Sequence, residues 1–450
     1  MIPREKPPAM ESSFEILRSD ECVCLLASLA EQFAVQVFLV GGCLRDAVMG
    51  RPVHDYDFAL SGAEEKLPLE FASRTRGSFF WLDRERQQSR VVIGRGGEAI
   101  TCDFAPIRGS GIHYDLALRD FTINALALPV TQEPDALLDP LQGLRDIAEG
   151  KVRSCGAGNF DDDPLRLLRA LRFAATLDFS IESATWQEML KRPHLLEGVA
   201  GERVRDELFL ILGSRNVAAS LELLHLSGLL PLIIPGIGRN GASHYKFVER
   251  SAFAADVEQV LENCAELFPA DREQLAAHLH RHIEGNIPLF ALLKLAAFLS
   301  GEDARKQIKV CGDRLRFGTK ARAELEMLCS CATSFPCLPR DPSTGRVLFR
   351  FFRDRLPGGA ELVILPLAAM LVDPETAGRL VAYYFRDYRT DDANLLLSGD
   401  DVMELLGIGP GPQLGRILET LREAESTGQV RTSGEAREFL LKNQLTTDGQ

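Results

Sequence analysis

The segment LVGGCLRDAVMGRPVHDYDFAL, residues 39–60, decides the fold class of the N-terminal part of the chain. An apolar stretch at residues 37–40 runs into Gly41 and Gly42, which predicts a strand that turns directly into a short helix ending at Gly50. Paired glycines at such a turn let the backbone approach a ligand closely, and the helix N-terminus offers free N–H groups to a phosphate. A plain tight turn explains the same residues equally well, so this part alone identifies no site.

The end of the segment carries two carboxylates on a predicted strand. Asp55 and Asp57 are two residues apart, so both side chains lie on one face of that strand. Neighbouring carboxylates repel each other and lose hydration when buried, and a divalent cation such as Mg²⁺ resolves that conflict. A solvated edge strand or an Asx-turn is the alternative interpretation.

A third carboxylate, Asp103, lies in the segment AITCDFA, residues 99–105. Ile100, Cys102 and Phe104 alternate as a buried face, which places Asp103 on the opposite face. If this strand pairs beside residues 55–60, three carboxylates converge, which is enough to hold two metal ions roughly 3.5–4 Å apart. An exposed aspartate is the alternative.

The chain changes character after about residue 150. Residues 1–12 predict a loose polar arm and residues 13–34 an amphipathic helix. From residue 163 onward, segments rich in Leu, Ala and Arg with a 3.6-residue period dominate. The sequence therefore predicts an α/β head with a mixed sheet, followed by an all-α remainder. The predicted strands of the head are separated by Gly, Pro and Asp clusters and lie at residues 36–40, 55–60, 78–82, 89–93, 99–105 and 123–130.

Bulk composition predicts a globular protein of several structural units. The 450 residues are 46% hydrophobic and 26% charged. The net charge of −13 argues mildly against nucleic-acid binding, although a local basic face can lie on an acidic protein. The N-terminus lacks the apolar core of a signal peptide and no apolar run is long enough for a membrane span, so we expect a cytoplasmic protein without a membrane partner. The densest cysteine group lacks the paired C-x₂-C spacing of zinc sites and is expected to hold no metal: Cys311, Cys329, Cys331 and Cys337.

Together these motifs resemble class II tRNA nucleotidyltransferases and bacterial poly(A) polymerases, the family that includes the CCA-adding enzymes. The resemblance is strong over residues 36–210, patchy in the middle, and clear again at 397–425. It implies a nucleotidyltransferase head at 1–150, a helical neck that recognises the base at 151–215, a helical body at 216–390 and an RNA-binding tail at 391–450. It also implies that Mg²⁺ is held by Asp55, Asp57 and Asp103, and that the nucleotide is approached by Gly41, Gly42 and Arg45.

The block RDFTINALAL, residues 119–128, matches a second motif of that family. By resemblance, Arg119, Asp120 and Asn124 approach the ribose and phosphates of the incoming nucleotide, and their chemistry suits hydroxyl and phosphate groups. The family often has a second basic residue where this chain has Leu118. The start of a helix is the alternative interpretation of the block.

The segment DDDPLRLLRALRFA, residues 161–174, predicts a helix with Pro164 at its first position and Asp162 or Asp163 as its cap. In the family, an acidic residue and an arginine here pair with the base edge, which in this chain would be Asp163 and Arg166. An acceptor beside a donor suits cytosine and adenine and rejects uracil and guanine. A capped helix with local ion pairs is the alternative. The same helix presents one broad basic face, formed by Arg166, Arg169 and Arg172.

Two departures from the family limit the functional prediction. Only residues 109–114 separate Arg108 from Asp115, where full CCA-adding relatives carry a longer flexible segment. This suggests CC-only addition, addition of a single nucleotide, or an unrelated compensating device. In the body, Ser300 and Gly301 stand where many relatives have a His-Asp metal site, so we expect no phosphohydrolase activity there.

We therefore expect a Mg²⁺-dependent enzyme that adds C, A or both to tRNA 3′ ends from CTP and ATP. A poly(A) polymerase that extends many RNAs with ATP is the second candidate. A non-catalytic RNA-binding protein on the same fold is the third. The sequence predicts no particular oligomeric state.

Overall fold

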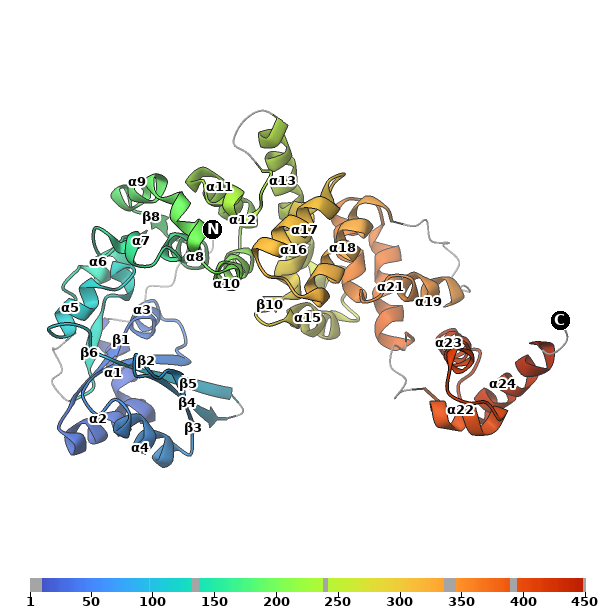
Figure 1. The fold of residues 1–450 in the computed structure, drawn as a ribbon, viewed down its shortest axis with the longest axis horizontal. Helices are drawn as coiled ribbons and strands as arrows, with labels where there is room; N and C mark the ends of the chain where they lie inside the picture. Colours follow the sequence, from blue (N-terminus) through green and yellow to red (C-terminus); the bar gives the residue numbers. More distant parts are fainter. Residues whose placement is uncertain are drawn as a thin grey trace. The chain divides into compact units, whose positions relative to one another are not determined.

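The computed structural model describes residues 10–96, 98–131, 137–237, 242–335, 345–388 and 395–447. The chain divides into two compact units, residues 1–199 and 200–450, shown in Figure 1. The first is an α/β unit and the second is almost entirely helical, which confirms the predicted fold class. The finer division into head, neck, body and tail stays a prediction.

A six-stranded mixed sheet forms the centre of the first unit, with strand order β3-β4-β5-β2-β1-β6. Strands β2 and β5 are parallel, and the other neighbouring pairs are antiparallel. The strands are β1 (Gln36–Val40), β2 (Asp55–Ser61), β3 (Ser78–Asp83), β4 (Gln88–Arg95), β5 (Glu98–Pro106) and β6 (Ala127–Pro129). Five of the six strand predictions are thus confirmed closely. The sixth was too long, because Thr122–Asn124 forms a 3₁₀ turn before β6 begins.

Helices cover one face of this sheet and leave carboxylates on the other. Helix α4 (Lys66–Thr75) packs on β3 and β4, and α2 (Glu21–Phe33) packs on β1 and on α4. The core beneath them is aromatic: Phe58 of β2 stacks on Phe104 of β5 at 5.3 Å between ring centroids, and Phe71 of α4 meets Phe104 edge-on at 5.6 Å. Because side chains alternate along a strand, Asp57 and Asp103 lie on the opposite face.

The predicted helix at 13–34 is wrong in its continuity. The structure has α1 (Met10–Ser19) followed by α2, and the break falls at Asp20. The Asp20 carboxylate accepts a hydrogen bond from the backbone N–H of Cys22 at 2.8 Å, which caps α2 and begins a new helix. Residues 10–12 of the predicted loose arm belong to α1, and residues 1–9 lie outside the described part of the chain.

Helix α3 (Gly42–Val48) contacts β1 and β2, and further helices follow to the end of the first unit. Two short strands, β7 (Lys151–Val152) and β8 (Ser180–Ile181), pair in parallel between them. The helices are α3 (Gly42–Val48), α5 (Ile112–Ala117), α6 (Gly143–Glu149), α7 (Asn159–Asp162), α8 (Arg166–Leu177) and α9 (Ser183–Lys191).

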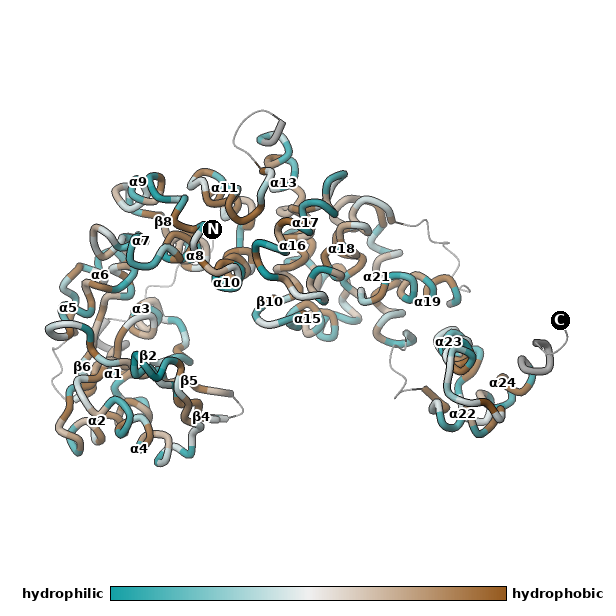
Figure 2. Tube along the Cα trace, viewed as in Figure 1, coloured by the Kyte–Doolittle hydropathy of each residue, from teal (hydrophilic) through white to brown (hydrophobic). Residues whose placement is uncertain are grey.

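Helices of the second unit pack around α16 (Leu289–Leu299), whose residues 291–299 are all buried and, apart from Lys294, apolar (Figure 2). The ammonium group of Lys294 pairs with Glu258 at 2.7 Å. A short two-stranded hairpin, formed by β9 (His282–Glu284) and β10 (Ile287–Pro288), precedes α16. The other α-helices of this unit up to residue 386 are α10 (Gly201–Leu212), α11 (Val217–Ser227), α12 (Leu230–Ile233), α13 (Ala242–Glu262), α14 (Cys264–Leu267), α15 (Arg272–His280), α17 (Ala304–Arg314), α18 (Thr319–Thr333), α19 (Gly345–Arg353), α20 (Ile364–Ala368) and α21 (Pro374–Arg386).

The last three helices are α22 (Gly399–Leu406), α23 (Pro412–Ser426) and α24 (Ser433–Thr447). Gly407, with φ +64°, ends α22 and Pro412 begins α23, as the Gly/Pro break in the sequence indicates. No helix in the described ranges is long and apolar enough to cross a membrane. Cys311, Cys329 and Cys331 are buried free thiols, and Cys337 lies outside the described residues.

Candidate active site

The predicted convergence of carboxylates begins with the pairing of β2 and β5. The two strands lie side by side in parallel, with Asp57 opposite Asp103 and Asp55 opposite Thr101. The Thr101 hydroxyl donates to Asp55 Oδ1 at 2.6 Å. Protein atoms crowd around Asp57, although its carboxylate stays open to water on the pocket side. This desolvation, together with the charges of Asp103 and Asp55, outweighs the nearby Arg119 and raises the pKa of Asp57 to about 6.

Arg90 of β4 is a partner that the sequence did not reveal. Its Nε and Nη2 atoms donate to the two oxygens of Asp103 at 2.6 and 2.7 Å, in a bidentate pair. Within the described ranges, no group of three acidic, histidine or cysteine side chains has the arrangement of a metal site. Asp55 and Asp57 nevertheless suit a hard cation, because their oxygens are the donors Mg²⁺ prefers, and because desolvation first and the charges of Asp103 and Asp55 second raise the pKa of Asp57 when no cation is bound. Arg90 occupies one acceptor site on each Asp103 oxygen, and the lone pairs that remain could still coordinate a cation beside Asp55 and Asp57.

The Gly-Gly turn brings the backbone close to this carboxylate. Gly41 has φ +81°, and a Cβ atom there would lie 3.2 Å from both Asp57 Oδ2 and Arg119 Nη1. A side chain is therefore disfavoured by backbone strain and by the close approach of these two charged groups. The guanidinium of Arg119 thus lies beside Asp57 at the Gly41 turn, a contact that the sequence did not predict.

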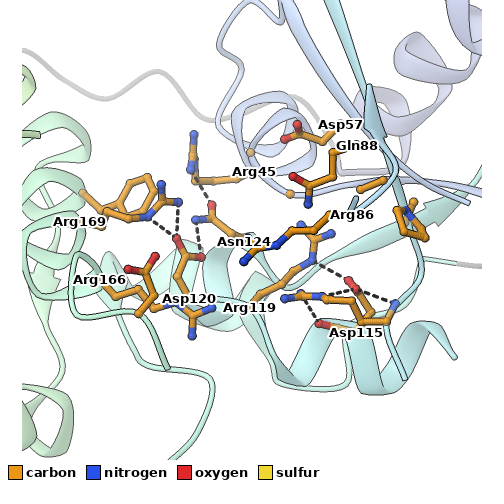
Figure 3. A pocket seen from close by; sticks show the side chains of 18 of the residues that line it. Arg45, Asp57, Arg86, Gln88, Asp115, Arg119, Asp120, Asn124, Arg166 and Arg169 are labelled. Carbon is orange, nitrogen blue, oxygen red and sulfur yellow. Dashed lines mark hydrogen bonds and ion pairs between the residues drawn. The ribbon is translucent and has the colours of Figure 1, made fainter. Parts of the chain in front are cut away.

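A chain of hydrogen bonds connects α3 to α8 through the second motif (Figure 3). Arg45 Nη1 donates to Asn124 Oδ1 at 2.6 Å, and Asn124 Nδ2 donates to Asp120 Oδ1 at 3.1 Å. Arg169 Nε and Nη2 donate to Asp120 Oδ2 at 2.9 and 2.5 Å. Burial alone would raise the pKa of Asp120, but the charge and hydrogen bonds of Arg169 lower it below its usual value. Both oxygens of Asp120 are thus engaged by protein groups, so it orients its neighbours.

The short connection at residues 109–114 is held at both ends by one buried carboxylate. Arg108 Nε donates to Asp115 Oδ1 at 2.7 Å, and Arg119 Nε donates to Asp115 Oδ2 at 3.2 Å. Desolvation raises the pKa of Asp115, but the hydrogen bond from Arg108 and the charges of both arginines outweigh it and lower the pKa. Gly109, with φ +67°, sits where a Cβ atom would lie 2.2 Å from the Tyr114 ring. Residues 109–111 therefore form a compact turn, and residues 112–114 already belong to α5.

The start of α8 differs from the predicted capped helix. The helix begins at Arg166, its N-cap is Leu165, and no side chain caps it, so the predicted cap is wrong. Pro164 lies in the preceding turn, where Asp163 Oδ1 accepts from the Leu165 N–H at 3.2 Å. Arg166 donates to the carbonyls of Leu118 at 2.9 Å and Asn159 at 3.2 Å. Leu118, where the family often has a second basic residue, thus accepts a hydrogen bond from Arg166 through its backbone carbonyl.

One pocket of about 950 Å³ in the first unit collects these groups (Figure 3). Seven arginines and four aspartates line it, so its walls carry a positive excess. Asp57 lines it, together with all the residues predicted to approach a nucleotide: Gly41, Gly42, Arg45, Arg119, Asp120, Asn124, Asp163, Arg166, Arg169 and Arg172. Sequence reasoning missed other lining residues, among them Arg86, Gln88, Arg108, Asp115 and Phe173. Arg108 and Asp115 flank the short connection, which was the available signal, whereas Arg86 and Gln88 lie in a hairpin without a motif.

A pocket of about 510 Å³ lies in the second unit and includes Ser300 and Gly301. Arg250 and Lys246 of α13 both face Asp303 in it, with Lys246 Nζ 3.4 Å from Asp303 Oδ2. The Ser300 hydroxyl donates to the Ala296 carbonyl at 2.7 Å. The absence of phosphohydrolase activity stays a prediction.

Comparisons with known proteins agree with this arrangement. A family described as the poly A polymerase head domain matches residues 37–153, and one described as a probable RNA and SrmB-binding site of polymerase A matches 178–239. A CC-adding tRNA nucleotidyltransferase of Geobacter sulfurreducens is 42% identical over 94% of this chain and 95% of its own length. An A-adding tRNA nucleotidyltransferase of Deinococcus radiodurans is 31% identical over 91% of this chain and 96% of its own.

Solved structures extend the likeness to the fold. The Bacillus stearothermophilus CCA-adding enzyme in complex with CTP has a TM-score of 0.64 at 22% identity and covers 99% of both chains. The Thermotoga maritima CCA-adding enzyme complexed with tRNA has a TM-score of 0.61 at 24% identity, over 96% of this chain and 98% of that one.

The fold and the relatives define a nucleotidyltransferase. The chain belongs to the family of tRNA nucleotidyltransferases and bacterial poly(A) polymerases.

Proposed function

We propose that this protein adds two C nucleotides to the 3′ end of tRNA, using CTP and Mg²⁺. The pocket supports this proposal most directly, because it joins Asp57 and the Gly41–Gly42 turn to an excess of arginines suited to a triphosphate. The 42% identical relative is a CC-adding enzyme, and two further CC-adding enzymes are 30% and 31% identical.

The proposed reaction is attack of the RNA 3′-hydroxyl on the α-phosphate of the nucleotide, with pyrophosphate as the leaving group. Asp55 and Asp57 would hold Mg²⁺, with Asp103 beside them across the strand pair. Bound there, two metal ions would activate the attacking hydroxyl and neutralise charge on the leaving group. Arg119, held by Asp115, would neutralise phosphate oxygens beside the Gly41 turn. Asp120 and Asn124 orient the guanidinium groups of Arg169 and Arg45.

Base selection is assigned to Asp163 and Arg166. A carboxylate accepts from the amino group of cytosine or adenine, and a guanidinium donates to the adjacent ring nitrogen. Uracil and guanine present the reverse order and would leave both protein groups unpaired, which is a strong ground for rejection. The bonds from Arg166 to Leu118 and Asn159 hold its guanidinium in one orientation, which supports this role.

The compact connection at 109–114 supports addition of C alone. Residues 112–114 of the connection are part of α5, and Asp115 of the same helix binds both Arg108 and Arg119, so the connection has a fixed conformation. In the resembling CCA-adding enzymes a longer flexible segment accompanies the switch from C to A. A connection fixed in this way has no comparable freedom.

The test offers CTP, ATP or both to tRNA transcripts that lack all three, the last two or only the last of their terminal nucleotides. We expect two C additions to the first transcript, one to the second and no A addition to the third. Incorporation of A onto the third transcript would show an A-adding activity, and long ATP-derived tails on many RNAs would show a poly(A) polymerase. No incorporation under any condition would favour the non-catalytic alternative.

A further inference from the structure

Three arginines of the pocket surround one aromatic ring. The guanidinium carbons of Arg172, Arg45 and Arg169 lie 4.1, 5.3 and 5.6 Å from the centroid of the Phe173 ring. Arg169, Arg172 and Phe173 belong to α8, whereas Arg45 comes from α3. A cation within about 6 Å of an aromatic centroid is attracted by the ring quadrupole. One side chain thus contacts three charges from two elements.

The Phe173 ring is itself fixed in place. It is only 4% exposed and meets the fully buried Phe121 edge-on, with 5.7 Å between centroids and 79° between ring planes. Phe121 directly follows Asp120 in the chain, and its N–H donates to Asp120 Oδ1 at 2.8 Å. The ring and the hydrogen-bonded carboxylate therefore belong to one packed assembly, and Phe173 cannot turn without disturbing it.

The Phe173 ring adds to a set of contacts that hold Arg45 and Arg169 in place. Arg45 is held on one side by Asp46 and Asn124, and Arg169 is held by Asp120, which also bonds Asn124. Cations gathered within a few ångströms repel each other, and a neutral aromatic ring lowers that repulsion without consuming their charge. An acidic residue in the place of Phe173 would neutralise the pocket instead.

We propose that Phe173 is a positioning residue, whose ring electrons hold Arg45, Arg169 and Arg172 in the array that receives the polyphosphate of the substrate. The inference rests on the proposed function for the identity of the substrate. The three arginines would bind any linear polyphosphate, because they recognise only the negative charge of the phosphates and the spacing between them.

The test replaces Phe173 in the full-length chain with phenylalanines carrying one, two or three ring fluorines. Fluorination withdraws electrons from the ring face while nearly preserving its shape, so it weakens the cation–π attraction. It also alters the edge-on contact with Phe121, and the melting temperature measures that second effect. The dissociation constants for CTP and for inorganic tripolyphosphate are measured by calorimetry. We expect both constants to rise stepwise, by about tenfold in all for the trifluorinated ring. The melting temperature should change little across the series.

Matched substitutions separate this role from simple packing. The same fluorinated series at Phe209, a 2% exposed residue of the second unit that packs on Phe317, should leave both constants unchanged. Phe173→Leu removes the ring and keeps an apolar side chain, and it should weaken binding of both probes at least as much as trifluorination. Constants that stay flat across the Phe173 series, or a Leu variant that binds as tightly as the unsubstituted protein, would overturn the proposal. If the affinity for tripolyphosphate falls with fluorination but the protein transfers no nucleotide to tRNA, the role of Phe173 stands and the proposed function is wrong.

Discussion

At the scale of single residues, the carboxylate of Asp57 lies where desolvation and neighbouring negative charges disfavour its ionised form. Its carboxylate faces Asp103 across the strand pair and shares a strand face with Asp55. Part of the folding free energy of the metal-free protein is therefore spent on keeping like charges together. The proposed cation at Asp57 would relieve this repulsion, so the carboxylate would favour binding at a cost in stability.

Asp57→Asn is expected to lower nucleotide transfer at least about 100-fold, because an amide is a weaker ligand for Mg²⁺ than a carboxylate. The same variant should be slightly more stable than the parent at neutral pH without metal, by no more than about 1–2 kcal/mol since water in the pocket screens the repulsion. Incorporation assays and melting in a chelating buffer measure the two effects. Asp178→Asn, at an exposed helix end with φ +59° that Asn tolerates, is the matched control and should retain activity.

The pKa of Asp57 gives a pH dependence with a defined sign. Its folded-state pKa, about 6, is higher than in the unfolded chain, so the folded protein binds the proton more readily. The unfolding free energy of the metal-free protein should therefore fall as pH rises from about 4 through 6. Transfer at low Mg²⁺ should change in the opposite direction, rising by about tenfold per pH unit below 6 and levelling off above it. A flat rate profile between pH 5 and 7 would show that Asp57 is not the limiting ligand.

At the scale of elements, the connection at 109–114 depends on the carboxylate of Asp115. This group is only 3% exposed and neutralises Arg108 and Arg119, one of which reaches the Gly41 turn. Glu149 also bonds two cations, Arg145 and Lys151, but it does so at the surface. The two carboxylates therefore form a natural comparison between a buried and an exposed ion-pair cluster.

Asp115→Asn should lower the unfolding free energy by about 1–3 kcal/mol, because it leaves two arginines without their charged partner. It should also lower kcat/KM for CTP about tenfold, since Arg119 loses its hold beside Asp57. Glu149→Gln should change the unfolding free energy far less than Asp115→Asn does, because exposed ion pairs contribute little. Urea unfolding and steady-state kinetics measure these quantities, and equal effects of the two substitutions would contradict the structural assignment.

Local sequence patterns predicted helices and strands correctly where the buried face of the element matched the apolar pattern. Alternation in AITCDFA placed Asp103 on the correct face, and the Gly-Gly turn marked the junction of β1 and α3. The apolar period continued across Asp20, so the break between α1 and α2 was missed although Asp20 is a good cap residue. Arg90 was missed for a different reason: its pairing with Asp103 depends on the register of β4 against β5, which no local pattern encodes.

At the scale of the whole molecule, the pocket belongs entirely to the first unit. All of its lining residues lie between Gly41 and Phe173, and this unit ends at residue 199. The second unit has its own apolar core around α16. We therefore expect the first unit to bind the nucleotide and the second unit to contribute contacts to the RNA.

A fragment of residues 1–199 should bind CTP with a dissociation constant within about threefold of the full chain, because it contains every lining residue. It should extend tRNA poorly, since it lacks the tail and body. Calorimetry with CTP and incorporation assays on both proteins test this. A folded fragment, verified by circular dichroism, that fails to bind CTP would show that the second unit contributes to the nucleotide site.

The lining of the pocket is drawn from four separate stretches of chain, within residues 41–59, 86–88, 105–124 and 163–173. Such a site exists only when the first unit is folded as a whole, so a ligand in it favours the folded state over every opened one. At a concentration one hundred times its dissociation constant, that preference is about 2.7 kcal/mol. Degradation by proteases acts on opened molecules. The nucleotide supply therefore influences how long each copy of this protein survives as well as how fast it works, and limited proteolysis with and without CTP would register the difference.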